Sequence, residues 1–258
     1  METIFQALKE IEKKKKIKIL YACETGSRAW GFPSPDSDYD VRFIYRHEAN
    51  WYLSLNKHKD TIEFITDNAL DISGWDLKKS LVMLKKSNAS LIERFQSPIE
   101  YFSENDFKES FTQLIESYYS PIAVFYHHYS LANKFWEAIK DREDLRLKDC
   151  FYLLRSLLSC NWIIRSKEVV PMHIEGLMTL IDEERKDSIR KLVQLKSAVT
   201  EKHVYRLESW LNKLISELKN FTDSNKSRVL INRKDYSLLN KFFLKSLYGD
   251  VNGTGNKK

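Results

Sequence analysis

The most constraining feature of this sequence is an apolar run that leads into a turn of small residues and then into two alternating acids. The run 17–22 has the composition of a buried strand, and Gly26 and Ser27 follow it closely. Asp38 and Asp40 then precede a second apolar run. Because residues two apart on a strand point to the same face, this text predicts a strand, a tight turn and a second strand that carries paired carboxylates.

Paired carboxylates on one face supply the hard oxygen ligands that magnesium prefers, and magnesium completes its coordination shell with water or phosphate oxygens. A glycine lets the backbone approach a ligand closely, and a serine hydroxyl beside it suits a phosphate group. We therefore expect a metal and nucleotide site formed by Gly26, Ser27, Asp38 and Asp40, with Mg²⁺ or Mn²⁺ as the cofactor.

The bulk properties are those of a globular protein. The 258 residues are 43% hydrophobic and carry a net charge of +6, which permits an anionic partner such as RNA. Much of that charge lies in the runs 13–16 and 257–258, which are typical of solvated helix faces or tails. Three cysteines without paired spacing fit neither a disulfide framework nor a zinc site, so we expect a cytoplasmic location. The sequence shows no secretion signal or apolar span, and no membrane partner is expected.

Strand signals are concentrated in the first part of the chain and helical signals in the second. This distribution predicts two regions of different architecture. The fold class that we expect, together with the family resemblance given below, is α+β, with a short mixed sheet and helices followed by an all-helical C-terminal domain. The predicted units are 1–104, a helical domain at 105–249 and a disordered tail at 250–258, whose apolar content is too low to fold.

Apolar spacing also assigns the individual elements. In the first part the predicted helices are 2–15, 75–86 and 89–95, and the predicted strands are 17–22, 41–46, 61–66 and 69–72. The last two strands are expected to form a hairpin that turns at Asp67-Asn68 and ends at Ser73-Gly74. Five or six helices are expected in the second part, where the candidate ranges are 104–117, 121–140, 147–166, 173–181, 185–198, 202–220 and 235–247.

Two-metal phosphoryl transfer uses three carboxylates, and two residues compete to be the third. Asp71 lies between Leu70 and Ile72, where a lone acid is costly unless it is paired or bound to a metal. If the hairpin reaches the strand of Asp38, the three acids converge. One alternative is that Asp71 caps the following helix or faces solvent. The competing candidate for the third acid is Glu63, whose strand also alternates. Spacing alone does not choose between them.

A basic helix face is a second candidate for nucleotide binding. Lys148, Tyr152 and Arg155 recur at helical spacing, and a lysine and an arginine in line are suited to hold a triphosphate. The alternative is a solvated face with local salt bridges, for instance to Glu143 or Asp144.

Two arginines flank the acids. Arg28 and Arg42 can each neutralise phosphate charge or pair with a carboxylate. Structural pairing is the favoured interpretation for Arg42, and both interpretations stay open for Arg28.

The segments 22–32 and 37–42 together resemble the signature of the DNA polymerase β-like nucleotidyltransferase superfamily, in which Gly-Ser is followed by Asp-x-Asp. The Arg-Ala-Trp-Gly text after Gly-Ser is similar to the YcgL/RlaP-type branch of predicted nucleotidyltransferases, some of which are associated with RNA repair. The similarity continues through 71–79 and 88–93.

The resemblance implies a role for each matching residue. Gly26 and Ser27 would contact nucleotide phosphates, Asp38 and Asp40 would bind the metal, and Asp71, rather than Glu63, would complete a catalytic triad of acids. Residues 1–104 would form the nucleotidyltransferase catalytic domain. Related enzymes close their cleft with a helical domain that carries basic residues, which assigns Lys148, Tyr152 and Arg155 to nucleotide binding by analogy.

The expected function is transfer of a nucleoside monophosphate, with AMP favoured, from an NTP such as ATP to an acceptor hydroxyl. Pyrophosphate is released by a two-metal mechanism. The positive charge favours RNA over a protein or a small molecule as the acceptor. The alternative function is a non-catalytic nucleotide- or RNA-binding module of the same fold, and an antitoxin-like interaction protein is a third class.

Overall fold

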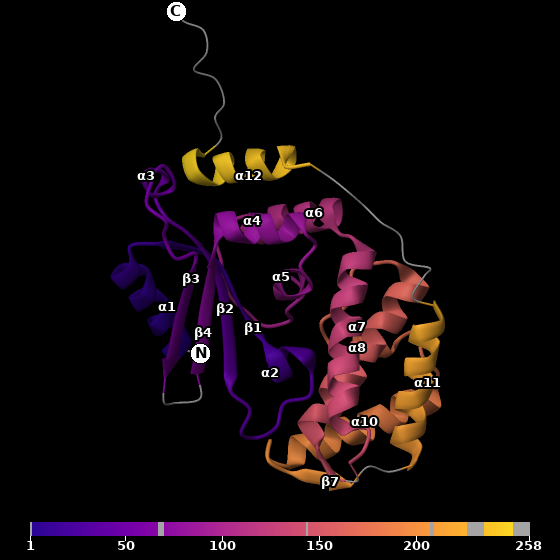
Figure 1. Ribbon diagram of the computed structural model, residues 1–258. Coiled ribbons are helices and arrows are strands. Elements are labelled where there is room, and N and C mark those ends of the chain that lie inside the picture. Colours follow the sequence, from indigo (N-terminus) through magenta and orange to yellow (C-terminus); the bar gives the residue numbers. More distant parts are fainter. Residues whose placement is uncertain (1, 67–69, 143, 207–208, 226–234, 250–258) are drawn as a thin grey trace, which may run out of the picture.

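The computed structural model describes residues 2–66, 70–142, 144–206, 209–225 and 235–249. A twisted sheet with helices on both faces forms one side of the molecule, and a group of longer helices forms the other (Figure 1). This arrangement confirms the predicted α+β class.

The sheet contains five strands in the order β3-β4-β2-β1-β5. β2 and β4 run parallel, whereas the other neighbouring pairs are antiparallel, so the sheet is mixed as predicted. The strands are β1 (Lys18–Thr25), β2 (Tyr39–Arg46), β3 (Thr61–Thr66), β4 (Leu70–Asp76) and β5 (Glu100–Ser103).

Helices cover the two faces of the sheet unequally. On one face α1 (Glu2–Lys15) buries Ile4, Leu8 and Ile11, which are spaced for one side of a helix, against strand residues such as Phe43 and Ile72. The other face meets α2, α4 and α5 and, beyond them, the longer helices. The short helices of this part are α2 (Gly26–Trp30), α3 (Ala49–Tyr52), α4 (Leu77–Lys85) and α5 (Ala89–Arg94).

The second part of the chain centres on α8 (Leu147–Ser166), which matches the predicted range 147–166 and buries residues on almost every side. No helix in the described ranges combines the length and apolar character needed to cross a membrane. The surrounding helices are α6 (Phe107–Tyr118), α7 (Pro121–Ile139), α9 (Ile174–Met178), α10 (Glu183–Ala198), α11 (Ser209–Asn225) and α12 (Ser237–Tyr248).

The expectation of an all-helical second part was wrong in one place. β6 (Asp144–Arg146) and β7 (Val204–Arg206) pair antiparallel, and the predicted helix 202–220 gives way to β7 followed by α11. Three-residue strands are too short to show an alternating pattern, and their partners lie far apart in the sequence.

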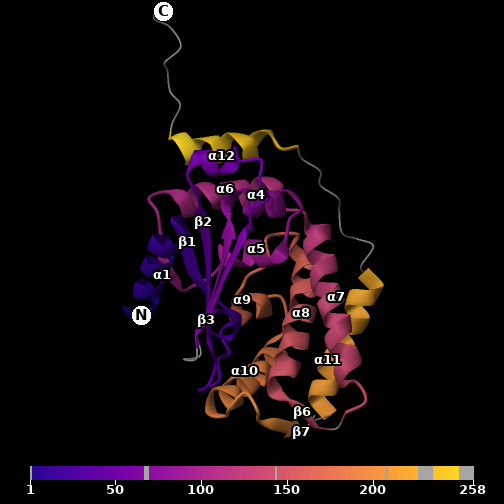
Figure 2. The same cartoon turned by 60° about the vertical axis from the view of Figure 1, so that its left-hand side comes forward.

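The core does not stop at the predicted boundary. One apolar cluster runs from the second sheet face into the helical part and joins Leu77, Phe111 and Phe151. α12 returns to pack on α4 (Figure 2), and its Phe243 ring meets Tyr52 at a centroid distance of 5.0 Å. The division at residue 104 stays a prediction.

Several details of the first part differ from the predictions. β4 continues through Gly74 to Asp76 instead of ending at Ser73-Gly74, and the Phe43 ring lies where a Cβ at position 74 would stand. The glycine therefore serves close packing in a strand, not a turn. β5 was not predicted, and the small-residue turn is the start of helix α2. The predicted turn at 67–68 and the tail 250–258 fall outside the described residues.

Candidate nucleotide and metal site at the start of β2

Strand register brings two of the predicted acids together. Asp40 on β2 stands directly beside Asp71 on the parallel strand β4, so both side chains lie on the same face. Arg42 Nη2 donates to Asp40 Oδ1 at 3.0 Å and to Asp71 Oδ2 at 2.8 Å. The pairing that the sequence favoured for Arg42 is therefore confirmed.

The register also separates the two candidates for the third acid. Glu63 on β3 is opposite Ser73, two residues beyond Asp71 along β4. The helix-capping alternative for Asp71 does not hold either, because Asp76 caps α4 by accepting a hydrogen bond from the Lys78 amide at 2.8 Å. Asp71 is thus the acid beside Asp40, and its role in metal binding stays a prediction.

Gly26 begins α2 directly after β1 and has a φ of +65°. A Cβ at this position would overlap the Asp40 carboxylate. Only glycine combines that backbone angle with so close an approach, so the glycine of the turn is explained by the acid packed against it. Ser27 follows as a largely buried residue of α2.

Glu24, the last but one residue of β1, was not singled out from the sequence. Its Oε1 accepts the Asp40 backbone N–H at 2.8 Å, and its Oε2 accepts the Tyr101 hydroxyl at 2.5 Å. Burial raises the pKa of the Glu24 carboxyl above its ordinary value. The signal in the sequence was an acid at the end of an otherwise apolar strand. The hydrogen bond from the Asp40 N–H shows that Glu24 positions the backbone of Asp40.

Residues 33–38, here named the aspartate loop, connect α2 to β2. Arg28 holds this loop from within the first part of the chain, because its Nη2 donates to the Ser37 carbonyl at 2.8 Å and its Nε donates to the Asp38 carbonyl at 3.2 Å. The guanidinium also lies 4.0 Å from the Tyr39 ring centroid. Arg28 thus has a structural role, and contact with a nucleotide stays a prediction.

The helical part also holds this loop. We name the group of side chains that make these contacts the Glu201 clamp: Ser34 and Ser37 of the loop, and Lys148, Lys196 and Glu201 of the helical part. Glu201 Oε1 accepts the Ser37 hydroxyl at 2.8 Å, and Lys196 Nζ donates to Ser34 Oγ at 2.7 Å. Lys148 Nζ lies 2.8 Å from Glu201 Oε2. Figures 1 and 2 show the loop reaching the end of α10.

Sequence reasoning missed this clamp, since Ser37 and Glu201 are separated by 164 positions. One local sign was present. Lys196 falls in the apolar stripe of α10 with Ile189 and Leu192, and its side chain is 1% exposed. A lysine in such a stripe is rarely buried without partners.

Lys148 and Tyr152, two of the three predicted basic-face residues, lie near enough to Asp40 for charge to act between them. Both interact electrostatically with Asp40, and Tyr152 packs edge-on against Trp30 at a centroid distance of 5.5 Å. Burial alone would lower the pKa of Lys148, but hydrogen bonds to Glu201 and Tyr152 outweigh it and raise that pKa. Lys148 therefore carries a positive charge opposite the carboxylates.

Arg155 does not join them. Its side chain is 7% exposed and donates to Glu93 Oε1 at 2.5 Å and to the Met172 carbonyl at 3.2 Å. The guanidinium lies 4.6 Å from the Trp30 ring centroid. Arg155 is therefore buried between α8 and the first part of the chain, neither solvated nor open to a ligand, and its predicted nucleotide contact is not supported by this geometry.

The acids make this end of the sheet a site for positive charge. Burial raises the pKa of Asp40, and the nearby charges of Asp71 and Asp38 raise it further, while Arg42 and Lys148 act in the opposite direction. Mutual repulsion of this kind is relieved by a bound cation.

The donor set fits a magnesium ion by its chemistry, because carboxylate oxygens are the ligands this ion prefers. Arg42 takes one oxygen each from Asp40 and Asp71, which leaves a second carboxylate oxygen on each. Within the described ranges, however, no three His, Cys, Asp or Glu side chains are gathered closely enough to enclose a metal as they stand. Binding would therefore require Arg42 or Asp38 to move.

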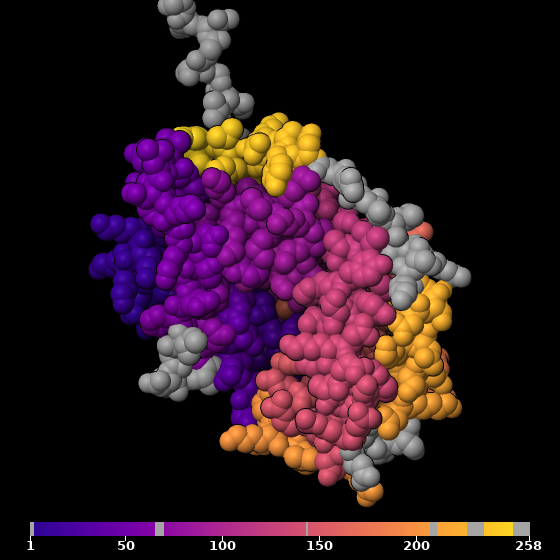
Figure 3. All heavy atoms as spheres, viewed as in Figure 1, coloured from indigo at the N-terminus to yellow at the C-terminus, as the bar shows by residue number. Residues whose placement is uncertain are grey.

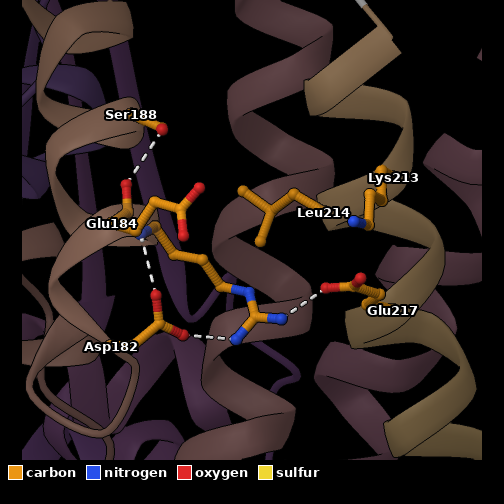
Figure 4. A pocket seen from close by; sticks show the side chains of 7 residues that line it. Asp182, Glu184, Ser188, Lys213, Leu214 and Glu217 are labelled. Atoms are coloured by element: carbon orange, nitrogen blue, oxygen red, sulfur yellow. Dashed lines mark hydrogen bonds and ion pairs between the residues drawn. The ribbon is translucent and has the colours of Figure 1, made fainter.

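The surface is indented where the residues of the sheet meet the α7–α8 region (Figure 3). A separate polar hollow of about 290 Å³ lies between α10 and α11 (Figure 4). Its Arg185 is already engaged in ion pairs with Asp182 and Glu217, so the positive charge of this side chain is not available to a ligand. The acids at the start of β2 are the stronger candidate.

A mixed sheet that presents paired aspartates beside a glycine turn, with a helical part opposite, defines a protein of the DNA polymerase β-like class. The chain matches the RlaP family, described as an RNA repair pathway DNA polymerase beta family, over residues 1–245. It is also 39% identical to the uncharacterized protein YcgL of Bacillus subtilis (strain 168) over 197 residues, and this aligned region covers 76% of each of the two chains. The chain belongs to the RlaP family, and the resemblance seen in its signature is confirmed.

Proposed function

We propose that this protein transfers a nucleoside monophosphate, with AMP favoured, from an NTP to an acceptor hydroxyl and releases pyrophosphate. The observation that carries this proposal is the register of Asp40 beside Asp71, with Gly26 packed against Asp40. Membership of a polymerase β-like family supports nucleotidyl transfer in general. The nucleotide, the metal and the acceptor are parts of the proposal.

Asp38, Asp40 and Asp71 would hold Mg²⁺ or Mn²⁺, which when bound supplies charge stabilisation for the phosphates. The backbone at Gly26 and the hydroxyl of Ser27 would bind phosphate oxygens, and Lys148 would neutralise the departing pyrophosphate.

The reaction forms a bond between the acceptor oxygen and the α-phosphorus and breaks the bond from that phosphorus to pyrophosphate. Asp71 would accept the proton of the acceptor hydroxyl, a role supported by the carboxylate oxygen that Arg42 does not use. Glu24 contributes by fixing the backbone of Asp40. Catalysis would rest mainly on positioning and charge neutralisation.

RNA is the acceptor that we favour over a protein or a small molecule. The family description names an RNA repair pathway, and the chain carries a net charge of +6. A polyanionic acceptor would make binding steeply dependent on salt concentration, whereas a small neutral acceptor would not.

Incubation with each α-labelled NTP and Mg²⁺ or Mn²⁺, in the presence of separate RNA, protein and metabolite fractions, tests the proposal. We expect label in the RNA fraction with ATP, release of pyrophosphate, and loss of both in Asp40→Asn. Label transfer that persists in Asp40→Asn would contradict the mechanism.

The second candidate is a non-catalytic nucleotide- or RNA-binding module. The ion pairs of Arg42 with both acids favour it, because they satisfy the carboxylates without a metal. Such a module would bind ATP, release no pyrophosphate, and bind equally well as Asp40→Asn.

A further inference from the structure

A hollow of about 630 Å³ lies at the opposite end of β2 from the paired aspartates. It is bounded by the end of α1, the segment after β2 and the edge strand β3, and its lining includes Lys15, Tyr45, His47, Trp51 and His58. The active-site proposal uses none of these residues.

Three flat rings form a stack on one side of the hollow. The centroids of His47 and Trp51 are 3.9 Å apart with planes 10° from parallel, and those of Trp51 and His58 are 4.7 Å apart at 28°. Burial lowers the pKa of His47, which keeps its ring neutral. His58 ends the stack and is exposed, so a further flat ring has a surface to stack on.

A buried hydroxyl also lines this hollow. Tyr45 is 0% exposed, and its hydroxyl has no hydrogen-bonding partner in the described part of the chain. Burial raises the pKa of Tyr45, so the hydroxyl remains protonated and can both donate and accept. Buried hydroxyls are ordinarily satisfied, and one left without a partner beside a hollow points to a polar ligand.

Positive charge surrounds the stack. Lys15 and Lys59 line the hollow, and further exposed lysines adjoin them in the runs 13–16 and 57–59. Of the two acids in the lining, Asp60 is paired with Lys79 at 2.8 Å, which leaves Glu63 as the other. Stacked rings beside a basic surface are how proteins bind single-stranded nucleic acid.

We propose that this hollow binds one nucleotide of a single-stranded RNA, with the base on the His58 end of the ring stack, its edge toward the Tyr45 hydroxyl, and its phosphates near Lys15 and Lys59. That the bound nucleic acid is RNA rests on the proposed function. The hollow would give this RNA a second contact with the protein, outside the active site.

The hollow and the acids are well separated. Tyr45 and Asp40 are five positions apart on β2, so they lie on opposite faces of the sheet and ~17 Å apart along the strand at ~3.3 Å per residue. A strand held in the hollow reaches the acids by passing the sheet edge at β3. Several nucleotides are therefore needed to contact both places.

The test is fluorescence anisotropy of a labelled single-stranded RNA oligonucleotide with the full chain, without NTP. We expect His58→Ala to weaken oligonucleotide binding about 10-fold, the effect of losing one stacking surface. Tyr45→Phe should weaken it by a smaller factor while leaving the urea midpoint equal or higher. Lys59→Glu should weaken binding and flatten its salt dependence.

The matched controls are Tyr126→Ala, an exposed aromatic on α7, and Lys191→Glu, an exposed lysine on α10. The inference is overturned if intact protein does not bind the oligonucleotide, or if His58→Ala and Tyr126→Ala bind it equally well. Oligonucleotide binding by the intact protein without any label transfer would overturn only the proposed function. Label transfer to RNA at an equal rate in His58→Ala and intact protein would overturn only this inference.

Discussion

The two sides of the candidate active site are built in different ways. On the sheet side, backbone pairing between β2 and β4 fixes Asp40 beside Asp71. On the helical side, Lys148 is placed by single side-chain contacts of the Glu201 clamp, between segments far apart in the chain. We expect the positions of Asp40 and Asp71 to be kept when one neighbouring side chain is removed, because backbone pairing fixes them. The position of Lys148 should depend on each side chain of the clamp. Four substitutions test this contrast.

The largest expected effect is on the sheet side and is chemical. We expect Asp71→Asn to reduce nucleotidyl transfer roughly 10²–10³-fold, as for loss of one charge-stabilising group at a reacting centre. The fold should persist, because the Asp71 side chain is 40% exposed and strand pairing does not need it. Initial rates and circular dichroism measure the two effects. Glu63→Gln on β3 is the matched control, and an equal loss of rate in both variants would falsify the assignment of Asp71.

On the helical side the expected effect is structural. Glu201→Gln removes the carboxylate charge next to the buried Lys196 ammonium, so we expect the free energy of unfolding to fall by about 2–3 kcal/mol. Urea unfolding measures it. Glu184→Gln, an exposed position on α10, should change the same quantity by less than about 0.5 kcal/mol. Similar values for the two variants would mean that the clamp contributes nothing.

A comparison of intact protein with Glu201→Gln at different pH values gives a second test of the clamp. Burial alone would raise the pKa of Glu201, but Lys148, Ser37 and Lys196 together lower it below its ordinary value. A carboxyl with a lowered pKa contributes stability that is present above the unfolded pKa and is lost as pH falls through the folded one. The stability gap between intact protein and Glu201→Gln should therefore narrow below about pH 4. A gap that stays constant to about pH 3 speaks against the clamp.

Gly26→Ala tests the close packing on the sheet side. Gly26 and Gly249 both have positive φ, at +65° and +77°, but a Cβ at position 249 would meet no atom within 4 Å. Alanine strains both backbones, and at position 26 it also overlaps Asp40. We expect Gly26→Ala to lose about 1–2 kcal/mol more than Gly249→Ala in urea unfolding. Equal losses would show that Asp40 yields without cost.

The smallest expected effect comes from one hydroxyl of the clamp. Ser37 Oγ donates to Glu201 and accepts the Ser34 amide at 2.9 Å. Its removal in Ser37→Ala should reduce the free energy of unfolding by about 1 kcal/mol. Ser197→Ala, whose hydroxyl bonds only within α10 among the described residues, is the control, with a change of less than about 0.5 kcal/mol. A smaller loss for Ser37→Ala than for Ser197→Ala would contradict the clamp.

The sheet side could be predicted from the sequence because its information is local. Alternation located β2, a resemblance to a family chose Asp71, and the glycine before the acids marked the turn. The prediction failed where a strand was short, as in β5 and β6, or where Gly74 served packing in place of a turn.

The helical side could be predicted only in outline. The spacing of Lys148, Tyr152 and Arg155 located helix α8, yet Lys148 pairs with Glu201 and Arg155 is buried on Glu93. A helical period gives the direction of a side chain around its own axis, but not what the neighbouring helices place against it. The roles of Glu24 and Glu201 could not be predicted either, because the residues that they contact are distant from them in the sequence.

The long separation within the Glu201 clamp has a consequence for the order in which the molecule is made. Synthesis proceeds from the N-terminus, and the sheet region can begin to fold first. Asp38, Asp40 and Asp71 therefore leave the ribosome well before Lys196 and Glu201, which hold the aspartate loop from the far side. A nascent or truncated chain that ends before residue 196 carries every acid of the site and the Arg28 contacts to the aspartate loop, but it lacks the contacts from Lys196 and Glu201. The loop is therefore held from both sides only when most of the chain has been translated.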